Sequence, residues 1–162
     1  MRNFYFSVIF ALFTLFANTQ PQISMFRTTP EHTSSFTLQN NFVFGDEAWK
    51  FNVDAPVRST AVCNSSTVFF GSSKGILYAL DKSNGNIKWQ FNSGYSIESS
   101  PALFNSTVFF ADNKQSLYSL NAINGKLNWK LDFGENLDYA WGFDYYYSSP
   151  TITDSKINLL CT

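Results

Sequence analysis

Six aromatic side chains lie within nine residues near the C-terminal end of the chain, in the segment YAWGFDYYY at 139–147. Exposed aromatic rings commonly mark surfaces that bind a protein or a glycan, because they offer large contact areas. The alternative is that the segment folds over a sheet edge and buries its own rings. On the binding interpretation, the candidate surface consists of Tyr139, Trp141, Phe143, Tyr145, Tyr146 and Tyr147.

Residues that could ligate a metal or act as nucleophiles are few and scattered. The chain has one histidine, His32, and no Cys-x-x-Cys pair, which makes a zinc site improbable. We expect Cys63 to be a buried free thiol, with a disulfide to Cys161 as the alternative. The acidic residues form no calcium loop of alternating ligands. We therefore predict no catalytic, cofactor-binding or metal-binding residue. The acids considered are Asp112, Asp132, Glu135, Asp138, Asp144 and Asp154.

Two Asn-x-Ser/Thr sequons, at Asn64 and Asn105, are candidate glycosylation acceptors. Each falls in a turn between two strands, and we expect the two turns to occupy equivalent places in consecutive repeats. In a eukaryotic secretory pathway, we expect glycans on such exposed turns. In a bacterium, the same residues are ordinary turn formers, because Asn and Ser close turns through local hydrogen bonds.

The composition favours β-structure and excludes a typical nucleic-acid binder. Aromatic residues make up 19% of the 162 residues and charged residues only 14%. Aromatic side chains suit pleated surfaces. The net charge is −1 and no basic run is present, so the positive footprint of a nucleic-acid-binding protein is missing.

The first 19 residues have the layout of a secretory signal peptide. Arg2 precedes an apolar run over 4–16, and small or polar residues follow it. A bilayer span needs about 20 apolar residues. We therefore expect cleavage, with an uncleaved signal anchor as the alternative, and no transmembrane segment afterwards. The expected location is extracytoplasmic, meaning extracellular, periplasmic or in an endomembrane lumen.

Trp49, Trp89 and Trp129 recur at a fixed interval of 40 residues. Residues 49–88 aligned without gaps on 89–128 give fifteen identities in forty positions. Each unit contains several short apolar runs that are separated by turn residues. Repeats of this length with four short strands are typical of β-propeller blades. The sequence therefore predicts an all-β partial propeller of four-stranded antiparallel blades.

The turns in each unit position the tryptophan. Asn-Gly between alternating strands favours a tight hairpin, and Gly85 and Gly125 occupy this place before Trp89 and Trp129. A large rigid ring at a fixed place on each outer strand can pack on the neighbouring blade. We therefore predict a structural docking role for all three repeated tryptophans and the two glycines.

The segment ALDKSNGNIKW at 79–89 fits the pattern AxDxxxGxxxW and resembles the tryptophan-docking motif of pyrroloquinoline-quinone-type (PQQ-like) β-propeller repeats. The second copy keeps Gly125 and Trp129 but has Ser119 and Asn121 at the Ala and Asp positions. The resemblance covers about 25–160. It implies that a strand near the N-terminus completes the last blade of the ring, which assigns Trp49 to such a closing strand.

These observations predict seven segments along the chain. A complete ring of six to eight blades needs about 240–320 residues, so we expect a fragment, with assembly from several copies as the alternative. The expected segments are the signal peptide at 1–19, an N-terminal segment at 20–47, a closing outer strand and linker at 48–56, blade 1 at 57–96, blade 2 at 97–134, an aromatic inter-blade insertion at 135–147, and the truncated start of blade 3 at 148–162.

The resemblance suggests two functions. The first is a secreted, non-catalytic binding or scaffold module with a protein or glycan partner. The alternative is the N-terminal part of a PQQ-dependent quinoprotein dehydrogenase. Such enzymes hold PQQ with an adjacent Cys-Cys pair and calcium with acidic ligands. This sequence has no adjacent cysteines, and its acids form no recognisable calcium loop. We expect no cofactor in this chain, and PQQ with calcium only if it belongs to a longer dehydrogenase.

Overall fold

The structure, a computed structural model, describes residues 23–24, 47–133, 149–153 and 156–159, and the regular elements in these ranges are all β-strands. Two to six residues form each strand. The strands are β1 (Ile23–Ser24), β2 (Val62–Cys63), β3 (Thr67–Gly71), β4 (Ile76–Asp81), β5 (Ile87–Asn92), β6 (Ala102–Phe104), β7 (Thr107–Ala111), β8 (Ser116–Asn121), β9 (Leu127–Asp132), β10 (Thr151–Thr153) and β11 (Lys156–Asn158).

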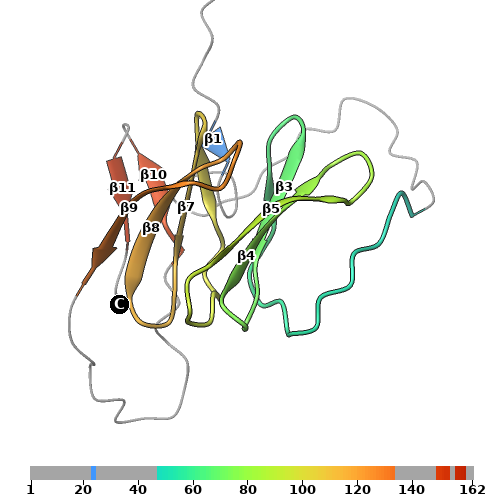
Figure 1. Ribbon diagram of the computed structural model, residues 1–162. Coiled ribbons are helices and arrows are strands. Elements are labelled where there is room, and N and C mark those ends of the chain that lie inside the picture. The colour runs from blue at the N-terminus through green and yellow to red at the C-terminus, as the bar shows by residue number, and fades with distance from the viewer. Residues whose placement is uncertain (1–22, 25–46, 134–148, 154–155, 160–162) are drawn as a thin grey trace, which may run out of the picture.

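The strands form three separate antiparallel sheets that follow one another along the chain (Figure 1). Blade 1 has the order β2-β3-β4-β5, and blade 2 has the order β6-β7-β8-β9 with β1 added beside β6. Strands β10 and β11 form a third, two-stranded sheet. In Figure 1, blade 2 lies between blade 1 and this third sheet. A meander of four neighbouring strands is the arrangement of a propeller blade.

The 40-residue repeat extends to the details of strand register. Phe69 pairs with Ala79 in blade 1, and Phe109 pairs with Ser119 at the equivalent place in blade 2. Both blades also shift register one residue after this position, between strands three and four. The two sheets therefore have the same pairing and the same irregularity.

The largest core cluster is shared by the two blades. It joins Phe69 and Trp89 of blade 1 to Phe110 and Tyr118 of blade 2. Phe91 of β5 packs edge-on against both of these blade 2 rings, with centroid distances of 6.1 and 5.8 Å. Because each sheet is only one layer thick, most of its apolar surface is buried by the next blade.

Serine hydroxyls link the inner edges of the blades. The Ser99 hydroxyl donates to the Ala111 carbonyl and accepts from the Ala111 amide, at 2.7 and 2.9 Å, and Ser59 does the same with Gly71. Between blades, the Thr60 amide donates to Ser100 Oγ, and the Ser100 amide donates to Ser149 Oγ, both at 2.9 Å. These hydroxyls thus satisfy backbone groups where strand pairing stops.

Residues 48–56, which we expect to be a closing outer strand, pair with no other strand in the described ranges, and this assignment stays a prediction. Trp49, Phe51 and Val53 nevertheless keep the alternation of a strand and pack on the cluster of Phe70, Tyr78 and Leu80. We call 48–56 the strap; it is attached to blade 1 by these side chains and by one backbone hydrogen bond, from the Ser73 amide to the Pro56 carbonyl at 2.9 Å. Its backbone lacks a neighbouring strand within the described ranges.

One expectation needs correction, and one strand was not predicted. Cys63 is exposed, not buried, because Val62 takes the inward position on β2 and the next side chain points outward. The N-terminal segment contributes β1, which pairs Ile23 with Phe104 and adds an unexpected fifth strand to blade 2. No helix long and apolar enough to cross a membrane occurs in the part of the chain that the structure describes.

Candidate functional site at the blade interfaces

Trp89 projects from the outer strand of blade 1 into a fitted position on blade 2. Its indole N–H donates to the Ala122 carbonyl at 3.1 Å, and its side chain is only 9% exposed. The ring lies on Gly125, where an added Cβ would lie 2.7 Å from Trp89 Cε3. Only glycine therefore allows the indole to approach the turn this closely.

Trp49 of the strap repeats this contact on blade 1. Its indole N–H donates to the Lys82 carbonyl at 2.9 Å. A Cβ at Gly85 would lie 2.5 Å from Trp49 Cε3. In both contacts the acceptor lies 33 residues after the tryptophan. The strap therefore occupies on blade 1 the position that the outer strand of a preceding blade would take.

Each tryptophan ring packs on a five-residue docking turn, 81–85 in blade 1 and 121–125 in blade 2. The first and fifth residues set the conformation of this turn. Gly85 and Gly125 have φ of +74° and +71°, a conformation that side chains disfavour. Asp81 Oδ1 accepts from the Ser83 amide at 2.9 Å, and Asn121 Oδ1 accepts from the Ile123 amide at the same distance. The Ser83 hydrogen bonds also lower the pKa of Asp81. Asn121 can replace aspartate because the turn requires only an acceptor oxygen.

Each docking turn is hydrogen-bonded to the first hairpin turn of its own blade. The Ala122 amide donates to the Ser106 carbonyl at 2.9 Å, and the Lys82 amide donates to the Ser66 carbonyl at 3.0 Å. The two residues whose carbonyls accept the indole N–H groups, Lys82 and Ala122, are therefore each hydrogen-bonded to a sequon turn through their own amides.

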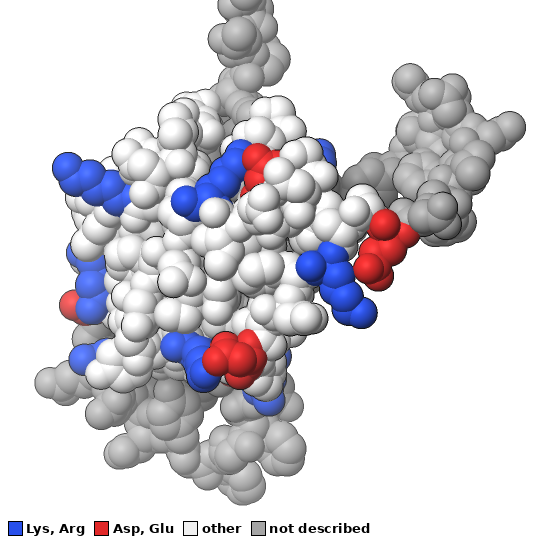
Figure 2. All heavy atoms as spheres, turned by 45° about the vertical axis from the view of Figure 1, so that its right-hand side comes forward, with Lys and Arg blue, Asp and Glu red and all other residues white. Residues whose placement is uncertain are grey.

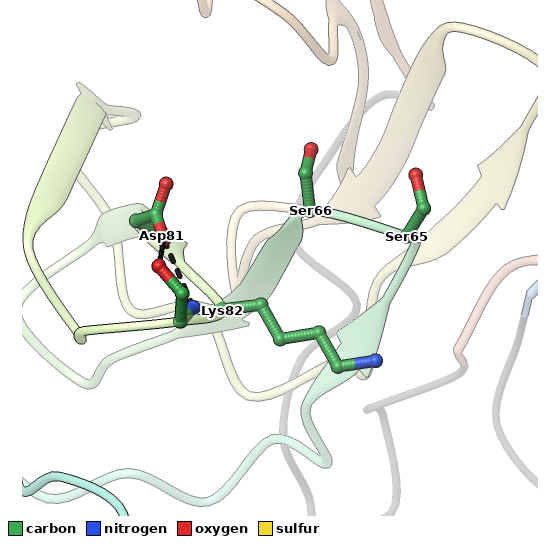
Figure 3. A pocket seen from close by; sticks show the side chains of 5 residues that line it. Ser65, Ser66, Asp81 and Lys82 are labelled. Atoms are coloured by element: carbon green, nitrogen blue, oxygen red, sulfur yellow. Dashed lines mark hydrogen bonds between the residues drawn. The ribbon is translucent and has the colours of Figure 1, made fainter.

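In blade 1 the two turns border an open polar hollow. Its walls are Ser65 and Ser66 from one turn and residues 81–83 from the other (Figure 3). Lys88 lies beside it, with its ammonium donating to the Ser66 carbonyl at 2.8 Å and pairing with Asp81 at 3.3 Å. These contacts stiffen the turns that receive Trp49.

A buried carboxylate lies next to the interface in blade 2. Tyr118 donates its hydroxyl to Asp112 Oδ2 at 2.8 Å, and Asp112 Oδ1 accepts from the Lys114 and Ser116 amides. Burial, with help from the hydrogen bond and the negative charge of Asp112, raises the pKa of Tyr118 to about 12. The Lys130 ammonium lies over the tyrosine ring, 5.4 Å from its centroid. The network fixes the ring on which Phe91 packs.

Trp129 is the third repeated tryptophan, and no described residue covers it as blade 2 covers Trp89. Its ring lies on Phe109 at 6.0 Å, much as Trp89 lies on Phe69 at 5.7 Å. Yet 41% of Trp129 is exposed, against 9% of Trp89. Large apolar side chains alternate along this surface of β9, which we call the open face. It consists of Trp129, Leu131 and Phe133, which are between 41% and 50% exposed.

The acidic side chains take part in local contacts and do not converge on one point. Within the described ranges, no group of three or more His, Cys, Asp or Glu residues could hold a metal ion. The acids and their partners are Asp54 with Lys74, Asp81 with Ser83 and Lys88, Glu98 with Arg58 and Ser96, Asp112 with Tyr118, and Asp132 with Lys130 and Ser116.

The charged side chains also form no extended patch on the face that Figure 2 shows. Basic and acidic residues lie singly or in small groups of mixed sign around a broad uncharged area. Such a distribution offers no continuous positive surface to a nucleic acid on that face.

The structure brings together some of the residues singled out in the sequence and leaves others outside its described ranges. Trp49 meets Gly85, and Trp89 meets Gly125, in the two docking contacts. Asn64 and Asn105 both lie in β-hairpin turns. The aromatic segment 139–147, like His32 and Cys161, lies outside the described residues.

Comparison with known proteins identifies the repeat. The family model described as "Outer membrane protein assembly factor BamB", a PQQ-type repeat model, matches residues 43–140, which is more than half of the chain. The chain belongs to this PQQ-like repeat family. The resemblance seen in the motif at 79–89 is thereby confirmed. No curated protein sequence matches the chain significantly.

Solved structures agree with a propeller fold for this PQQ-like repeat chain. BamB from Moraxella catarrhalis matches with a TM-score of 0.54 and 18% identity over 67% of this chain and 31% of its own. A quinohemoprotein alcohol dehydrogenase from Pseudomonas putida matches with a TM-score of 0.54 and 16% identity, over 68% of this chain and 18% of its own. A europium-containing methanol dehydrogenase matches with a TM-score of 0.53 and 20% identity, over 68% of this chain and 21% of its own. The PQQ-like chain thus spans a third or less of these proteins, and the all-β partial propeller is confirmed.

Sequence reasoning missed the Asp112–Tyr118 pair and the serine links between the blades. The repeat itself contained a signal for the first, because Asp112 replaces Ser72 of blade 1 while the tyrosine is kept at Tyr78 and Tyr118. An acid that appears in only one copy, six residues before a shared tyrosine, marks a local addition to the repeat. The serine links require knowledge of which strand edges meet.

We expect Gly125→Ala to destabilise the protein more than Gly94→Ala. Both glycines have positive φ, but a Cβ at Gly94 meets no atom within 4 Å, whereas one at Gly125 overlaps the Trp89 ring. The backbone penalty alone is about 1 kcal/mol. The displaced indole raises the expected loss to about 3 kcal/mol in Gly125→Ala. Denaturant unfolding measures both losses, and equal losses would contradict the docking contact.

We expect the Tyr118 network to lose its contribution in alkali. Because the folded pKa of Tyr118 is about 12 and the ordinary value is 10.0, the contribution is complete below pH 10.0 and disappears as pH rises through about 12. The free energy of unfolding should therefore fall more steeply in this window for wild type than for Tyr118→Phe, in which the lysines still titrate. Parallel pH profiles for the two proteins would show that the hydroxyl is not held in this way.

Proposed function

We propose that this chain is an extracytoplasmic, non-catalytic interaction module of the PQQ-like repeat family, and that the open face of β9 binds a partner protein. The observation that carries the proposal is the contrast between two equivalent tryptophans. Trp89 is covered by blade 2, whereas Trp129 sits on its own blade in the same manner with 41% of its surface exposed. The signal-peptide pattern at 1–19 supports the location.

The open face has the composition of a binding surface. Three large apolar residues alternate along β9 and the residue that follows it, and each is at least 41% exposed. Full burial of an apolar side chain of this size in an interface contributes about 1.5–3 kcal/mol to the free energy of binding. Lys130, on the opposite side of β9, pairs with Asp132 at 2.8 Å, so the charges of this strand compensate one another beside the apolar stripe. A partner can therefore cover the stripe without burying an unpaired charge.

The two tryptophans that are docked within the structure indicate the chemistry of the expected partner. Trp49 and Trp89 each pack on a turn with a positive-φ glycine, and a backbone carbonyl of that turn accepts the indole N–H. The open face presents the same donor and the same flat ring. The third sheet packs Ile152 on Ala102 and Phe109 on this side of blade 2 and leaves Trp129 41% exposed. We therefore infer that the occupant of the open face is a further PQQ-like blade with its glycine turn on Trp129.

The comparison with BamB, an outer membrane protein assembly factor, agrees with a binding role, although the chain covers only 31% of that protein. The dehydrogenases share the same fold at 16–20% identity. The acids of the described residues make local ion pairs and turn contacts, which gives no specific support to the quinoprotein alternative.

Site-specific photo-crosslinking tests the proposal in the full chain. A benzophenone amino acid replaces Leu131 on the open face or, as the matched control, Ile123, which is 74% exposed on the preceding turn. We expect the probe at 131, and not the probe at 123, to form an adduct with a glycine-turn peptide of a PQQ-like blade from another protein. Mass spectrometry identifies the peptide.

Three other outcomes would contradict the proposal. An adduct within 134–162 of the same chain would show that the chain covers its own open face. An adduct with a second copy would show self-association alone. Specific binding of PQQ with calcium in calorimetry, together with alcohol oxidation, would favour the dehydrogenase alternative.

A further inference from the structure

The two sequons lie in corresponding turns but occupy different positions within them. In blade 2, Phe104 pairs with Thr107, so Asn105 and Ser106 are the two residues at the tip. In blade 1, the corresponding tip residues are Ser65 and Ser66, since Asn64 aligns with Phe104 in the repeat and its amide donates to the Thr67 carbonyl. The sequons are therefore displaced by one residue relative to the sheet.

This displacement gives the two asparagines different surroundings. The Asn64 side chain is half-buried, and its Oδ1 accepts from the Ser66 and Thr67 amides at 2.9 and 2.8 Å. Asn105 is exposed and has a φ of +53°, which asparagine tolerates better than most residues. One carboxamide thus holds its turn together, while the other lies at the tip of a tight hairpin.

An aromatic ring stands next to the exposed acceptor. Phe104 directly precedes Asn105 and lies opposite Thr107, the hydroxyl residue of the sequon, in the antiparallel pair. Directly opposed residues of such a pair extend their side chains on the same face of the sheet. Phe104 is half-buried against the cluster that contains Ile152, so part of this residue remains accessible.

We propose that Asn105 is an N-glycosylation site, and that the first sugar of its glycan packs on the Phe104 ring. The C–H face of a pyranose is apolar, and covering an aromatic ring with it removes apolar surface from water. Asn64 has Cys63 in the corresponding preceding place, so a sugar there finds no ring. The inference rests on the extracytoplasmic location under the proposed function.

The glycan also has a structural consequence for the docking site. Ser106, the second tip residue, accepts from the Ala122 amide, and the Ala122 carbonyl accepts from the Trp89 indole. A sugar that restrains the Asn105 turn therefore also restrains the receptor for Trp89. The open face lies on β9, separated from β6 in the sheet by β7 and β8, and stays accessible.

Expression of the full chain with its own leader in a eukaryotic secretory host tests the proposal. We expect exported protein to carry a glycan at Asn105 by glycopeptide mass spectrometry. Trimming to a single sugar should preserve the melting temperature, and complete removal should lower it by about 3 °C. Asn105→Asp should match the fully deglycosylated protein, because aspartate tolerates the same backbone conformation.

Two variants supply the controls. Phe104→Leu keeps an apolar side chain on the cluster but removes the ring, and its melting temperature should not respond to deglycosylation. Asn64→Asp removes the other sequon while keeping its turn-forming oxygen, and it should retain the full response.

The outcomes separate this inference from the proposed function. Exported protein with Asn105 unmodified would overturn the glycosylation site alone. If the melting temperature of the glycosylated protein does not change when the sugar is removed, the contact with Phe104 is overturned. Failure of export would contradict the extracytoplasmic location and the glycan together.

Discussion

The contact between an indole ring and a glycine turn is the constraint on which the rest of this structure depends. A single-layered blade cannot bury its own faces, so it is stable only when a neighbour covers it. Trp89 provides a large apolar area and one directional hydrogen bond to Ala122, and Gly125 provides the space for it. The remaining interface residues, such as Phe91 on Tyr118, pack around this fixed point. The interaction therefore sets both the spacing and the order of the blades.

The same contact gives the assembly a direction. Each blade presents a tryptophan on one side and a glycine turn on the other, so the contacts are head-to-tail. On blade 1 the turn is filled by Trp49 of the strap, which attaches without strand pairing. On blade 2 the third sheet covers Phe109 through Ile152, and Trp129 on the same side stays 41% exposed. The interaction role that we propose follows from this polarity, because an exposed donor surface of this kind is complementary to a further blade.

The sequence predicted the features that repeat, and it failed where one copy differs from the other. Spacing alone identified Trp49, Trp89 and Trp129 together with Gly85 and Gly125, because a duplicated motif reports a duplicated environment. It did not reveal β1, because a two-residue strand is too short to show alternation. Cys63 was assigned to the wrong face by an error of one residue along β2. The Asn64 and Asn105 turns differ by the same one-residue displacement, which only the strand register reveals.

Native-state hydrogen exchange on Trp89→Ala tests the central claim most directly, because it reads the stability of each blade separately. The slowest amides of β4 and β8 report on blade 1 and blade 2. If the indole contact couples the blades, these amides share one opening free energy in the wild type and separate by more than about 1 kcal/mol in the variant. A common opening free energy in both proteins would show that the blades are held together by something other than the docked tryptophan.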